Sequence, residues 1–303
     1  MCRLRSNQPI AIFMEDHLGK SIGKMGYGLL RFSENPIVCV IDSCHAGKSV
    51  SDVVDSPRDC PVVSTVSEAA ALGAEVFVLG IAPSGGLLPG PWFAVVDEAV
   101  ARGMSVVNGL HDRLSERYPD LGLEQWVWDI RCEPKGLGVG TARARLLDNK
   151  RVVMVGTDMA NGKMTAGLLL HRLALERGVT SEFLATGQIG ISICGGGLPL
   201  DAVRVDYAAG AVEKFVLERG DADLVVVEGQ GSILHPGSTA TLPLLRGTCP
   251  THLILCHRAG QETLRRMDFL RMPHLAQVVR LYEDVARACG LLTPAKVVAI
   301  SLN

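Results

Sequence analysis

One stretch of the chain decides the fold: Val152-Val153-Met154-Val155-Gly156-Thr157-Asp158-Met159-Ala160-Asn161-Gly162-Lys163-Met164-Thr165. A short apolar strand runs into a loop bracketed by two glycines, and a lysine opens the helix that follows. In such a loop, successive backbone N–H groups point toward one place at the N-terminus of a helix, where they bind phosphate oxygens. The stretch therefore predicts a phosphate-binding loop formed by Gly156, Thr157, Asp158, Asn161, Gly162, Lys163, Met164 and Thr165.

Two differences from the standard phosphate-binding pattern affect the predicted chemistry. The loop has one more residue between its glycines, and the residue after Lys163 is Met164 instead of serine or threonine. The hydroxyl comes one place later, at Thr165, and one helical residue is a rotation of about 100°. We therefore do not expect Thr165 to bind magnesium as the hydroxyl of the standard pattern does. This weakens the interpretation as a nucleotide-hydrolysing site more than the interpretation as a site that holds phosphate.

Strand-like and helix-like segments alternate on both sides of this stretch, which predicts an α/β protein with parallel sheets. A glycine-rich and basic segment, Lys135–Lys150, separates two halves, so we predict one domain over residues 1–138 and a second over 139–303. The chain ends on a strand, where a further element is expected, so we expect an incomplete C-terminus. The predicted strands are Ile10–Phe13, Ile37–Ile41, Val76–Ile81, Ser105–Val107, Arg151–Val155, Glu182–Thr186, Asp223–Glu228, Thr251–His257 and Lys296–Leu302.

Helix signals accompany these strands. Thr65-Val66-Ser67-Glu68 is typical of a capping box at the start of a helix. Three sets of apolar residues at helical spacing predict helix faces directed toward a core. The sets are Trp92, Val95, Val96 and Ala99; Ala166, Leu169, Leu170 and Leu173; and Ala208, Val212, Phe215 and Val216.

The composition excludes several classes of protein. The 303 residues are 48% hydrophobic with a formal net charge of −2, which is unlike a disordered chain or a dedicated nucleic-acid binder. The nine cysteines are scattered without a C-x-x-C pair, so neither a disulfide scaffold nor a metal site is predicted. No apolar run approaches the roughly 18 residues of a membrane span, and Ile10–Met14 is too short for a secretory signal. We therefore expect a cytoplasmic protein that binds neither nucleic acid nor a membrane.

An acidic residue ends another apolar strand in the second half. Asp223–Glu228 is followed by Gly229-Gln230-Gly231-Ser232, and His235 comes soon after. In phosphate-loop proteins an acid in this place faces the phosphates and supports magnesium or a water molecule. His235 is a candidate general base or anion contact. A solvated terminal glutamate and a structural histidine remain the alternative interpretations.

Polar loops also follow the predicted strands of the first half, where open α/β sheets bind their ligands. These loops carry Ala82-Pro83-Ser84-Gly85-Gly86, Asn108-Gly109-Leu110-His111 and Asp129-Ile130-Arg131. The N–H groups of the serine and glycine loop can bind a carboxylate, and Arg131 can bind one with two parallel hydrogen bonds. An internal ion pair of Arg131 with Asp129 or with a neighbouring residue is the alternative. The early glycines do not match G-x-G-x-x-G, so no dinucleotide fingerprint is predicted.

These motifs together resemble the D-glutamate N-acetyltransferase (DgcN-type) family, formerly a family of domains of unknown function. The resemblance rests on the Gly156–Thr165 loop with its Gly-Lys-Met-Thr variant, on Glu228-Gly229-Gln230-Gly231-Ser232 with His235-Pro236, and on the loops of the first half. It covers nearly the whole chain. It implies a Rossmann-like N-terminal domain, a P-loop C-terminal domain and transfer of acetyl from acetyl-CoA to the amine of D-glutamate. The loop is also similar to that of dethiobiotin synthetase, an ATP-dependent enzyme.

The resemblance and the residues combine into one hypothesis. The Gly156–Thr165 loop holds the phosphates of acetyl-CoA, and an acidic amino acid lies in an interdomain cleft near Arg131 and Ser84-Gly85-Gly86, with Gln230 as a further contact. Glu228, His235 or His111 accepts the proton of the amine, and Glu228 is the first choice. An ATP- and magnesium-dependent ligase or kinase of the dethiobiotin synthetase type is the main alternative, and a nucleotide-sensing module is a third. We expect a small-molecule substrate and a homo-oligomer.

Overall fold

The computed structural model describes residues 4–83 and 85–303 of the chain. Its elements group into two compact units. The first contains the chain up to Cys132 together with Gln188–Gly196, and the second contains Glu133–Gly187 and Gly197–Asn303. A short helical segment from the second half of the chain, Gln188–Gly196, thus packs with the first unit.

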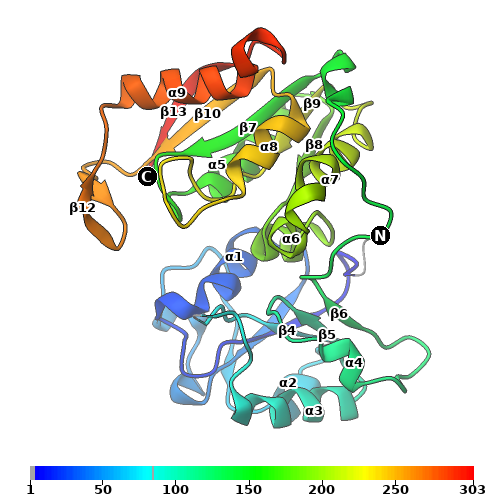
Figure 1. Cartoon of the computed structure of the whole chain (residues 1–303). Helices are drawn as coiled ribbons and strands as arrows, with labels where there is room; N and C mark the ends of the chain where they lie inside the picture. The colour runs from blue at the N-terminus through cyan, green and yellow to red at the C-terminus, as the bar shows by residue number, and fades with distance from the viewer. Residues whose placement is uncertain (1–3, 84) are drawn as a thin grey trace. The chain divides into compact units, whose positions relative to one another are not determined.

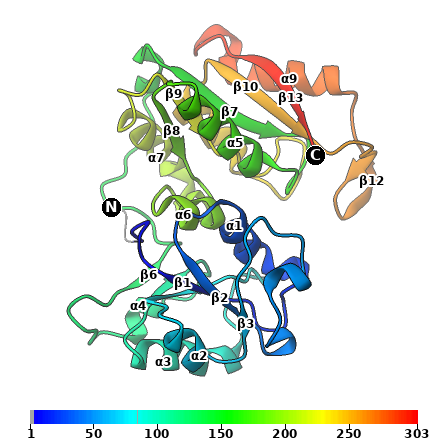
Figure 2. The ribbon, with the colours of Figure 1, turned by 180° about the vertical axis from the view of Figure 1, so that it is seen from behind.

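The first unit is built on a parallel sheet with the strand order β3-β2-β1-β4-β5-β6. The order reverses direction between β1 and β4, and open α/β sheets bind ligands at such a switch point. Helices α2 and α3 pack together on one face, whereas α1 and α6 pack against each other (Figures 1 and 2). The strands are β1 Ile10–Phe13, β2 Ile37–Ile41, β3 Val62–Val63, β4 Val76–Leu79, β5 Ser105–Asn108 and β6 Val127–Asp129, and the helices are α1 Lys24–Phe32, α2 Val66–Ala71, α3 Phe93–Ala101, α4 Leu114–Arg117 and α6 Gln188–Cys194.

The second unit has its own parallel sheet with the order β13-β10-β7-β9-β8. Helix α5 covers β7, β9 and β8 on one face, and α7, α8 and α9 form the other helical layer (Figure 2). A two-stranded antiparallel hairpin, β11 and β12, follows β10. The strands are β7 Lys150–Gly156, β8 Ser181–Leu184, β9 Leu224–Val227, β10 His252–His257, β11 Thr263–Leu264, β12 Met267–Arg271 and β13 Lys296–Leu302, and the helices are α5 Lys163–Glu176, α7 Val205–Leu217, α8 Thr241–Thr248 and α9 Leu275–Arg287.

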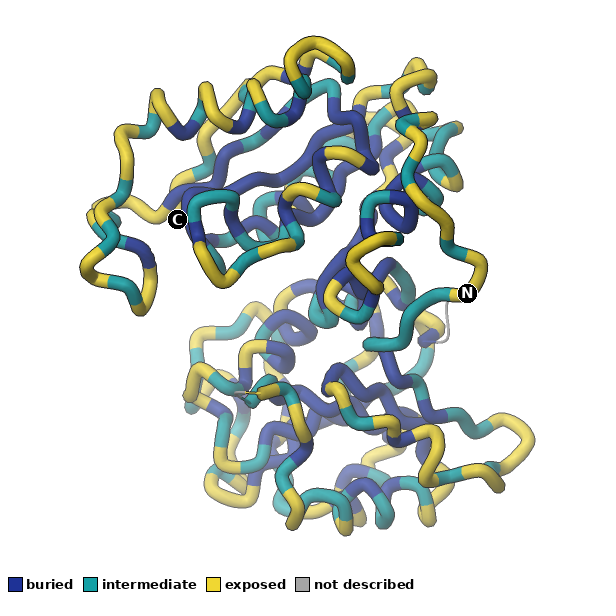
Figure 3. The backbone as a smooth tube through the Cα atoms, viewed as in Figure 1, coloured by how far each residue is buried: buried dark blue, intermediate teal, exposed yellow. Residues whose placement is uncertain are grey.

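Both sheets are buried through their central strands, which Figure 3 shows as dark segments inside each unit. Every residue of β1, β4 and β5 is buried, as expected where helices cover both faces of a parallel sheet. The predicted α/β architecture with two parallel sheets is confirmed, and each predicted strand is present with ends that differ by at most two residues. No helix within 4–83 and 85–303 is long and apolar enough to cross a membrane.

One predicted helix face is wrong. Leu169 and Leu173 of α5 are 50% and 42% exposed, although their spacing predicted a face directed toward the core. The helix approaches the sheet through Gly167 and Leu168 instead. A Cβ at Gly167 would lie 2.9 Å from the ring of Phe183, so the closest approach to the sheet requires a residue without a side chain. A pattern of apolar residues does not register such a contact, because glycine contributes no apolar side chain.

The other helix signals are confirmed. Thr65 and Glu68 form the predicted capping box of α2. In α3, Val96 and Ala99 are buried, and in α7, Ala208, Val212 and Val216 are buried. The remaining members of these sets, Trp92, Val95 and Phe215, are partly buried against the same cores.

Candidate functional site

The loop between β7 and α5 has the backbone of a phosphate-binding loop. Gly162 immediately precedes α5 and has φ of 90°, a left-handed conformation that side chains disfavour. Gly156 ends β7, and a Cβ there would lie 2.9 Å from the Lys163 ammonium nitrogen. The first N–H groups of a helix have no partner within the helix, so the start of α5 offers donors to an anion. The loop thus combines free backbone donors with a lysine that is folded back over the end of the strand.

Lys163 is a buried cation whose direct hydrogen-bond partners in the protein are neutral. Its side chain is 6% exposed, and its Nζ donates to the Asp158 carbonyl at 2.8 Å and to Asn161 Oδ1 at 2.9 Å. Both acceptors are neutral, and an ammonium has a third hydrogen to donate. Burial lowers the pKa of Lys163 to about 8, although the charges of Asp158 and Glu228 act in the opposite direction. An anionic ligand would supply the missing counter-charge, so the residues present fit a bound phosphate.

Three polar side chains of the loop point into the protein and fix its shape. Thr157, Asp158 and Asn161 are at most 1% exposed. Thr157 Oγ1 lies 3.0 Å from Nδ1 of His257, and Asn161 Nδ2 donates to the Cys256 carbonyl at 2.6 Å. These contacts tie the loop to β10. The loop residues predicted from the sequence therefore lie together, and these three side chains support the shape of the loop.

Asp158 joins the loop to the hairpin. Its Oδ2 accepts hydrogen bonds from Gln261 Nε2 at 2.5 Å and from the Arg265 backbone N–H at 2.7 Å. Sequence patterns gave no signal for His257, Gln261 or Arg265, because their partners lie about a hundred positions away in the chain. Met164 and Thr165 stand in the first turn of α5, and both are partly buried.

Glu228 follows β9 directly, beside the phosphate loop. It is 4% exposed, and its Oε2 accepts hydrogen bonds from the backbone N–H groups of Thr186 at 2.8 Å and Gly187 at 3.1 Å. Burial raises the pKa of Glu228 to about 7, against the effect of these two N–H groups and of Lys163. Oε1 has no hydrogen-bond partner among the described residues. A carboxyl group that titrates near neutral pH, with one oxygen open, is suited to accept a proton.

Gly229 explains how the acid and the lysine come together. A Cβ at Gly229 would lie 1.6 Å from the Met154 carbonyl oxygen and 2.8 Å from Lys163 Cδ. The end of β9 therefore passes against β7 more closely than any other residue would allow. Gln230 follows, and its side-chain nitrogen would lie 2.2 Å from a Cβ at Gly187, so another glycine makes room for it.

His235 is buried and is set up as a hydrogen-bond donor. Its side chain is 5% exposed, and its Nδ1 accepts a hydrogen bond from the Gly237 backbone at 3.1 Å. The hydrogen of the neutral ring is therefore on Nε2. A ring in this tautomer donates from Nε2 and has no free nitrogen with which to accept a proton.

In the first unit, a second cluster forms at the ends of β4, β5 and β6. Arg131 donates from Nε to the Gly109 carbonyl at 2.9 Å, and its Nη1 lies 2.5 Å from His111 Nε2. Since guanidinium groups only donate, His111 Nε2 is the acceptor there. Gly86 lies directly on this ring, because a Cβ at Gly86 would be 2.5 Å from His111 Cδ2. Gly85 and Gly86 both have left-handed φ angles, and the predicted Ser84 lies outside the described residues.

The acid beside this cluster is committed to the backbone and side chains around it. Asp129 accepts hydrogen bonds from Asn108 Nδ2 at 2.8 Å, from the Leu114 N–H at 3.1 Å and from Ser115 Oγ at 2.6 Å. These contacts hold the Asp129 carboxylate against the start of α4 and the end of β5. The cluster brings together Gly86 and Arg131, two residues predicted to bind a carboxylate, and His111, a predicted candidate base.

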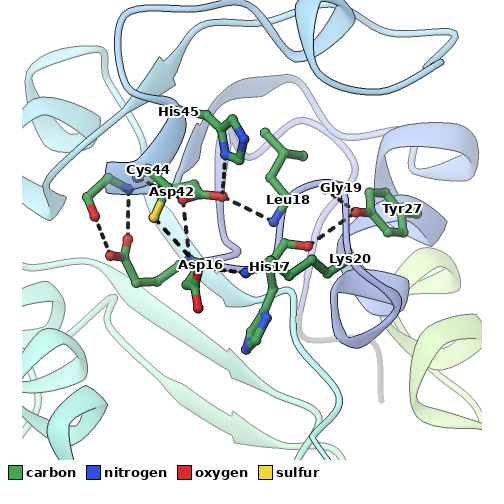
Figure 4. A network of polar contacts seen from close by, with 11 residues as sticks. Asp16, His17, Leu18, Gly19, Lys20, Tyr27, Asp42, Cys44 and His45 are labelled. Carbon is green, nitrogen blue, oxygen red and sulfur yellow. Dashed lines mark hydrogen bonds and ion pairs between the residues drawn. The ribbon is translucent and has the colours of Figure 1, made fainter.

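A polar network at the ends of β1 and β2 was not predicted (Figure 4). Asp42 follows β2 and is completely buried. Its carboxylate accepts hydrogen bonds from the backbone N–H groups of Leu18 at 3.1 Å and Cys44 at 3.0 Å, and its Oδ2 lies 3.2 Å from His45 Nδ1. An acid at the end of the second strand binds ribose in dinucleotide-binding proteins. Here it organises the two loops instead.

Comparison with known proteins identifies the family. A family described as "Domain of unknown function (DUF1611_C) P-loop domain" matches residues 138–303, and one described as "Domain of unknown function (DUF1611_N) Rossmann-like domain" matches residues 43–133. The chain belongs to the DUF1611 family. A DUF1611 family protein from Anabaena variabilis, known from a crystal structure, is 48% identical with a TM-score of 0.93, over 98% of this chain and 88% of that one.

Two curated relatives of this DUF1611 protein carry a functional name. A D-glutamate N-acetyltransferase from a Pseudoalteromonas species is 33% identical over 300 residues, covering 97% of this chain and 86% of the relative. A D-glutamate N-acetyltransferase from Tritonibacter scottomollicae is 34% identical over 245 residues, covering 79% and 72%. The predicted family, its Rossmann-like and P-loop domains and the enzyme class of acyltransferase are thereby confirmed.

Proposed function

We propose that this DUF1611 protein transfers acetyl from acetyl-CoA to the amino group of an acidic amino acid, most specifically D-glutamate. The observation that carries the proposal is the buried Lys163 ammonium, which has only neutral partners and stands beside Glu228. The names of the two curated relatives support the reaction class and the acceptor. A donor with phosphates suits the loop, because the transfer needs the phosphates to be held and not hydrolysed.

Glu228 is the residue that we propose as the general base. The amine must lose a proton before its nitrogen attacks the thioester carbonyl carbon; the C–N bond then forms, the C–S bond breaks and CoA leaves as a thiol. Glu228 has an open oxygen and a pKa of about 7, so it accepts a proton at neutral pH. His235 and His111 are less suitable because each has its acceptor nitrogen occupied. His235 Nε2–H instead provides a donor for the oxyanion that develops on the carbonyl.

Arg131 is the residue that we propose for a carboxylate of the acceptor. Two of its nitrogens are held by Gly109 and His111, which fixes the guanidinium plane. A fixed guanidinium binds a carboxylate with defined geometry at a small cost in side-chain entropy. Gly85 and Gly86 allow close approach beside it.

A substrate matrix tests the proposed function. Purified protein is offered acetyl-CoA with D-glutamate or L-glutamate, and in separate reactions ATP with Mg²⁺ and the same amino acids. We expect release of free CoA thiol with D-glutamate and none without an amino acid. Release of ADP without release of CoA would reject the acetyltransferase and support the ligase or kinase alternative. Binding of either nucleotide without turnover would support a sensor.

A further inference from the structure

A tyrosine hydroxyl connects the phosphate loop to the loop that follows Glu228. Tyr282 lies on α9, which packs along β13 (Figure 1), and its side chain is completely buried. Its hydroxyl donates to the Gly156 carbonyl at 2.6 Å and accepts a hydrogen bond from the Ile233 N–H at 3.1 Å. The hydroxyl therefore lies between the first residue of the phosphate loop and a residue two places before His235.

The two hydrogen bonds of Tyr282 have fixed directions. A backbone carbonyl only accepts and a backbone N–H only donates, so the phenol uses its O–H for Gly156 and a lone pair for Ile233. Burial raises the pKa of Tyr282, so the hydroxyl keeps its proton at neutral pH. A phenylalanine ring would fill the same space but leave both backbone groups unpaired, which is unfavourable in a buried place. The hydroxyl thus has a role that the ring alone does not fulfil.

The chain around His235 holds its own shape. We call residues 231–238 the His235 loop. The Ser232 N–H donates to Ser238 Oγ at 3.0 Å, and the His235 N–H donates to the Ser232 carbonyl at 3.2 Å. Gly231 allows this closure, because its φ is 65° and a Cβ there would lie 1.6 Å from Ser238 Oγ. We therefore expect the His235 loop to shift as one body if its attachment changes.

The attachment of the His235 loop to the phosphate loop goes through Tyr282. Within residues 4–83 and 85–303, no hydrogen bond runs directly between the two loops. Thr241 of α8 donates at 2.9 Å to the carbonyl just before the His235 loop, a contact that does not reach the phosphate loop. The phosphate loop is held to β10 by Thr157 and Asn161, and Glu228 is held by two N–H groups after β8. Loss of the hydroxyl should therefore leave these sites in place and release the His235 loop.

We propose that Tyr282 is a positioning residue whose hydroxyl fixes the His235 loop relative to the phosphate loop. The inference rests on the proposed function, because it takes His235 Nε2–H as the donor to the oxyanion and the phosphate loop as the holder of the acyl donor. Such a donor stabilises an oxyanion at about 2.7–3.1 Å. A displaced His235 loop therefore weakens stabilisation of the transition state, whereas the groups that bind the substrates stay where they are.

Tyr282→Phe tests this role because it removes the hydroxyl and keeps the ring. We expect kcat to fall about 10- to 100-fold, as for a misplacement of about 1 Å. The affinity for acetyl-CoA in titration calorimetry and the KM for D-glutamate should stay near their wild-type values. The rise of kcat/KM with pH through about 7 should also remain, because Glu228 keeps its partners.

Tyr207→Phe is the matched control for Tyr282→Phe. It removes a hydroxyl from α7 of the same unit, one that makes no hydrogen bond within residues 4–83 and 85–303. It should leave kcat unchanged, and melting temperatures near that of the wild type verify that both variants fold. An unchanged kcat in Tyr282→Phe, or a fall in kcat accompanied by an equal loss of donor affinity, would overturn the inference.

A double-mutant cycle identifies the residue through which Tyr282 acts. His235→Asn keeps an oxygen that accepts from the Gly237 N–H and removes the Nε2 donor. Residues that act as a unit are not additive, so Tyr282→Phe should lower kcat by less than about twofold in the His235→Asn background. The same full loss in both backgrounds would show that Tyr282 does not act through His235.

Amide hydrogen exchange at Ile233, followed by NMR, tests the connection without an activity assay. Loss of the hydrogen bond in Tyr282→Phe should speed exchange of the Ile233 N–H by at least about tenfold, while Tyr207→Phe exchanges like the wild type. Equal exchange in the wild type and Tyr282→Phe would overturn the connection. If the wild-type protein releases no CoA thiol with D-glutamate, the proposed function itself fails, and the exchange rates then decide the connection separately.

Discussion

Each of the two units contains a strand–loop–helix motif, but the start of the helix has a different role in each. In the first unit, the loop between β1 and α1 leads to a helix whose Gly26 N–H donates to the Gly80 carbonyl at 2.7 Å. In the second, the corresponding helix α5 begins with Lys163. Its ammonium group donates to two acceptors, which leaves one of its three hydrogens for a ligand. Both sheets present a helix N-terminus at the carboxyl edge of a central strand. Only the second keeps donors and charge available for a phosphate.

The acids that follow neighbouring strands show the same contrast. Asp42 in the first unit has both oxygens committed to backbone N–H groups and to His45. Glu228 in the second unit commits one oxygen and keeps the other open. A buried carboxylate with all of its acceptors satisfied is a structural support, whereas one with an open oxygen and a raised pKa can take part in proton transfer. Position at the end of a strand is therefore insufficient to mark a reactive acid.

The largest expected effect comes from Glu228→Gln. The amide keeps an oxygen for the N–H groups of Thr186 and Gly187 but cannot accept a proton. We expect kcat to fall by about 10²- to 10⁴-fold, the usual contribution of a general base. In the wild-type protein, kcat/KM should rise with pH through about 7, because the carboxylate form is the active one and burial raises the pKa of Glu228. Steady-state rates between pH 5.5 and 8.5 measure both; a variant that keeps the wild-type rate would exclude Glu228 as the base.

Lys163→Ala tests whether the N-terminus of α5, unlike that of α1, binds phosphate. We expect the affinity for acetyl-CoA to fall at least about a hundredfold, because the variant removes the one buried cation of the loop and its charge-assisted hydrogen bond. Lys24→Ala is the matched control, since Lys24 opens α1 as Lys163 opens α5. It should leave donor affinity unchanged. Equal effects of the two substitutions in titration calorimetry would contradict the assignment.

Substitutions of Arg131 test whether the first unit contributes the binding site for the carboxylate of the amino acid. Arg131→Ala should raise KM for the amino acid about tenfold with little change in donor affinity, and Arg131→Lys should recover only part of the loss because lysine cannot form two parallel hydrogen bonds. Arg102→Ala removes an exposed arginine of the same unit and serves as the control. A loss that appears in donor affinity and not in the KM for the amino acid would assign Arg131 to the other substrate.

The smallest effect is the pH dependence of donor binding. Lys163 has a pKa of about 8 in the free protein because burial disfavours its charge, and a bound phosphate raises this pKa. Protons are therefore taken up on binding above pH 8, and affinity falls by at most tenfold per pH unit there. Calorimetry in two buffers of different ionisation enthalpy measures the uptake. Absence of uptake at pH 8.5 would show that Lys163 is already neutral or already paired.

The sequence by itself determined the α/β architecture, the strands and the position of the phosphate loop. Each of these depends on local signals: apolar runs of strand length, a capping box and glycines at fixed offsets from a lysine. The gathering of Gly86, His111 and Arg131 was also predictable, because parallel strands place the loops at their carboxyl ends along one edge. These inferences need only the chain direction and the periodicity of the side chains.

Only the tertiary structure decided which polar groups form hydrogen bonds within the protein and which keep a donor or acceptor available. Asp42 and Glu228 both follow apolar strands, and no local pattern distinguishes them, since their partners are backbone N–H groups of other loops. The buried face of α5 was mispredicted because it also depends on a residue far away in the sequence. Gly167 can approach Phe183 closely only because it has no side chain. The position of the β11–β12 hairpin against the loop depends on contacts such as Gln261 with Asp158, about a hundred residues apart. Hydrogen-bond saturation and close packing are properties of three-dimensional neighbours, which a linear pattern does not contain.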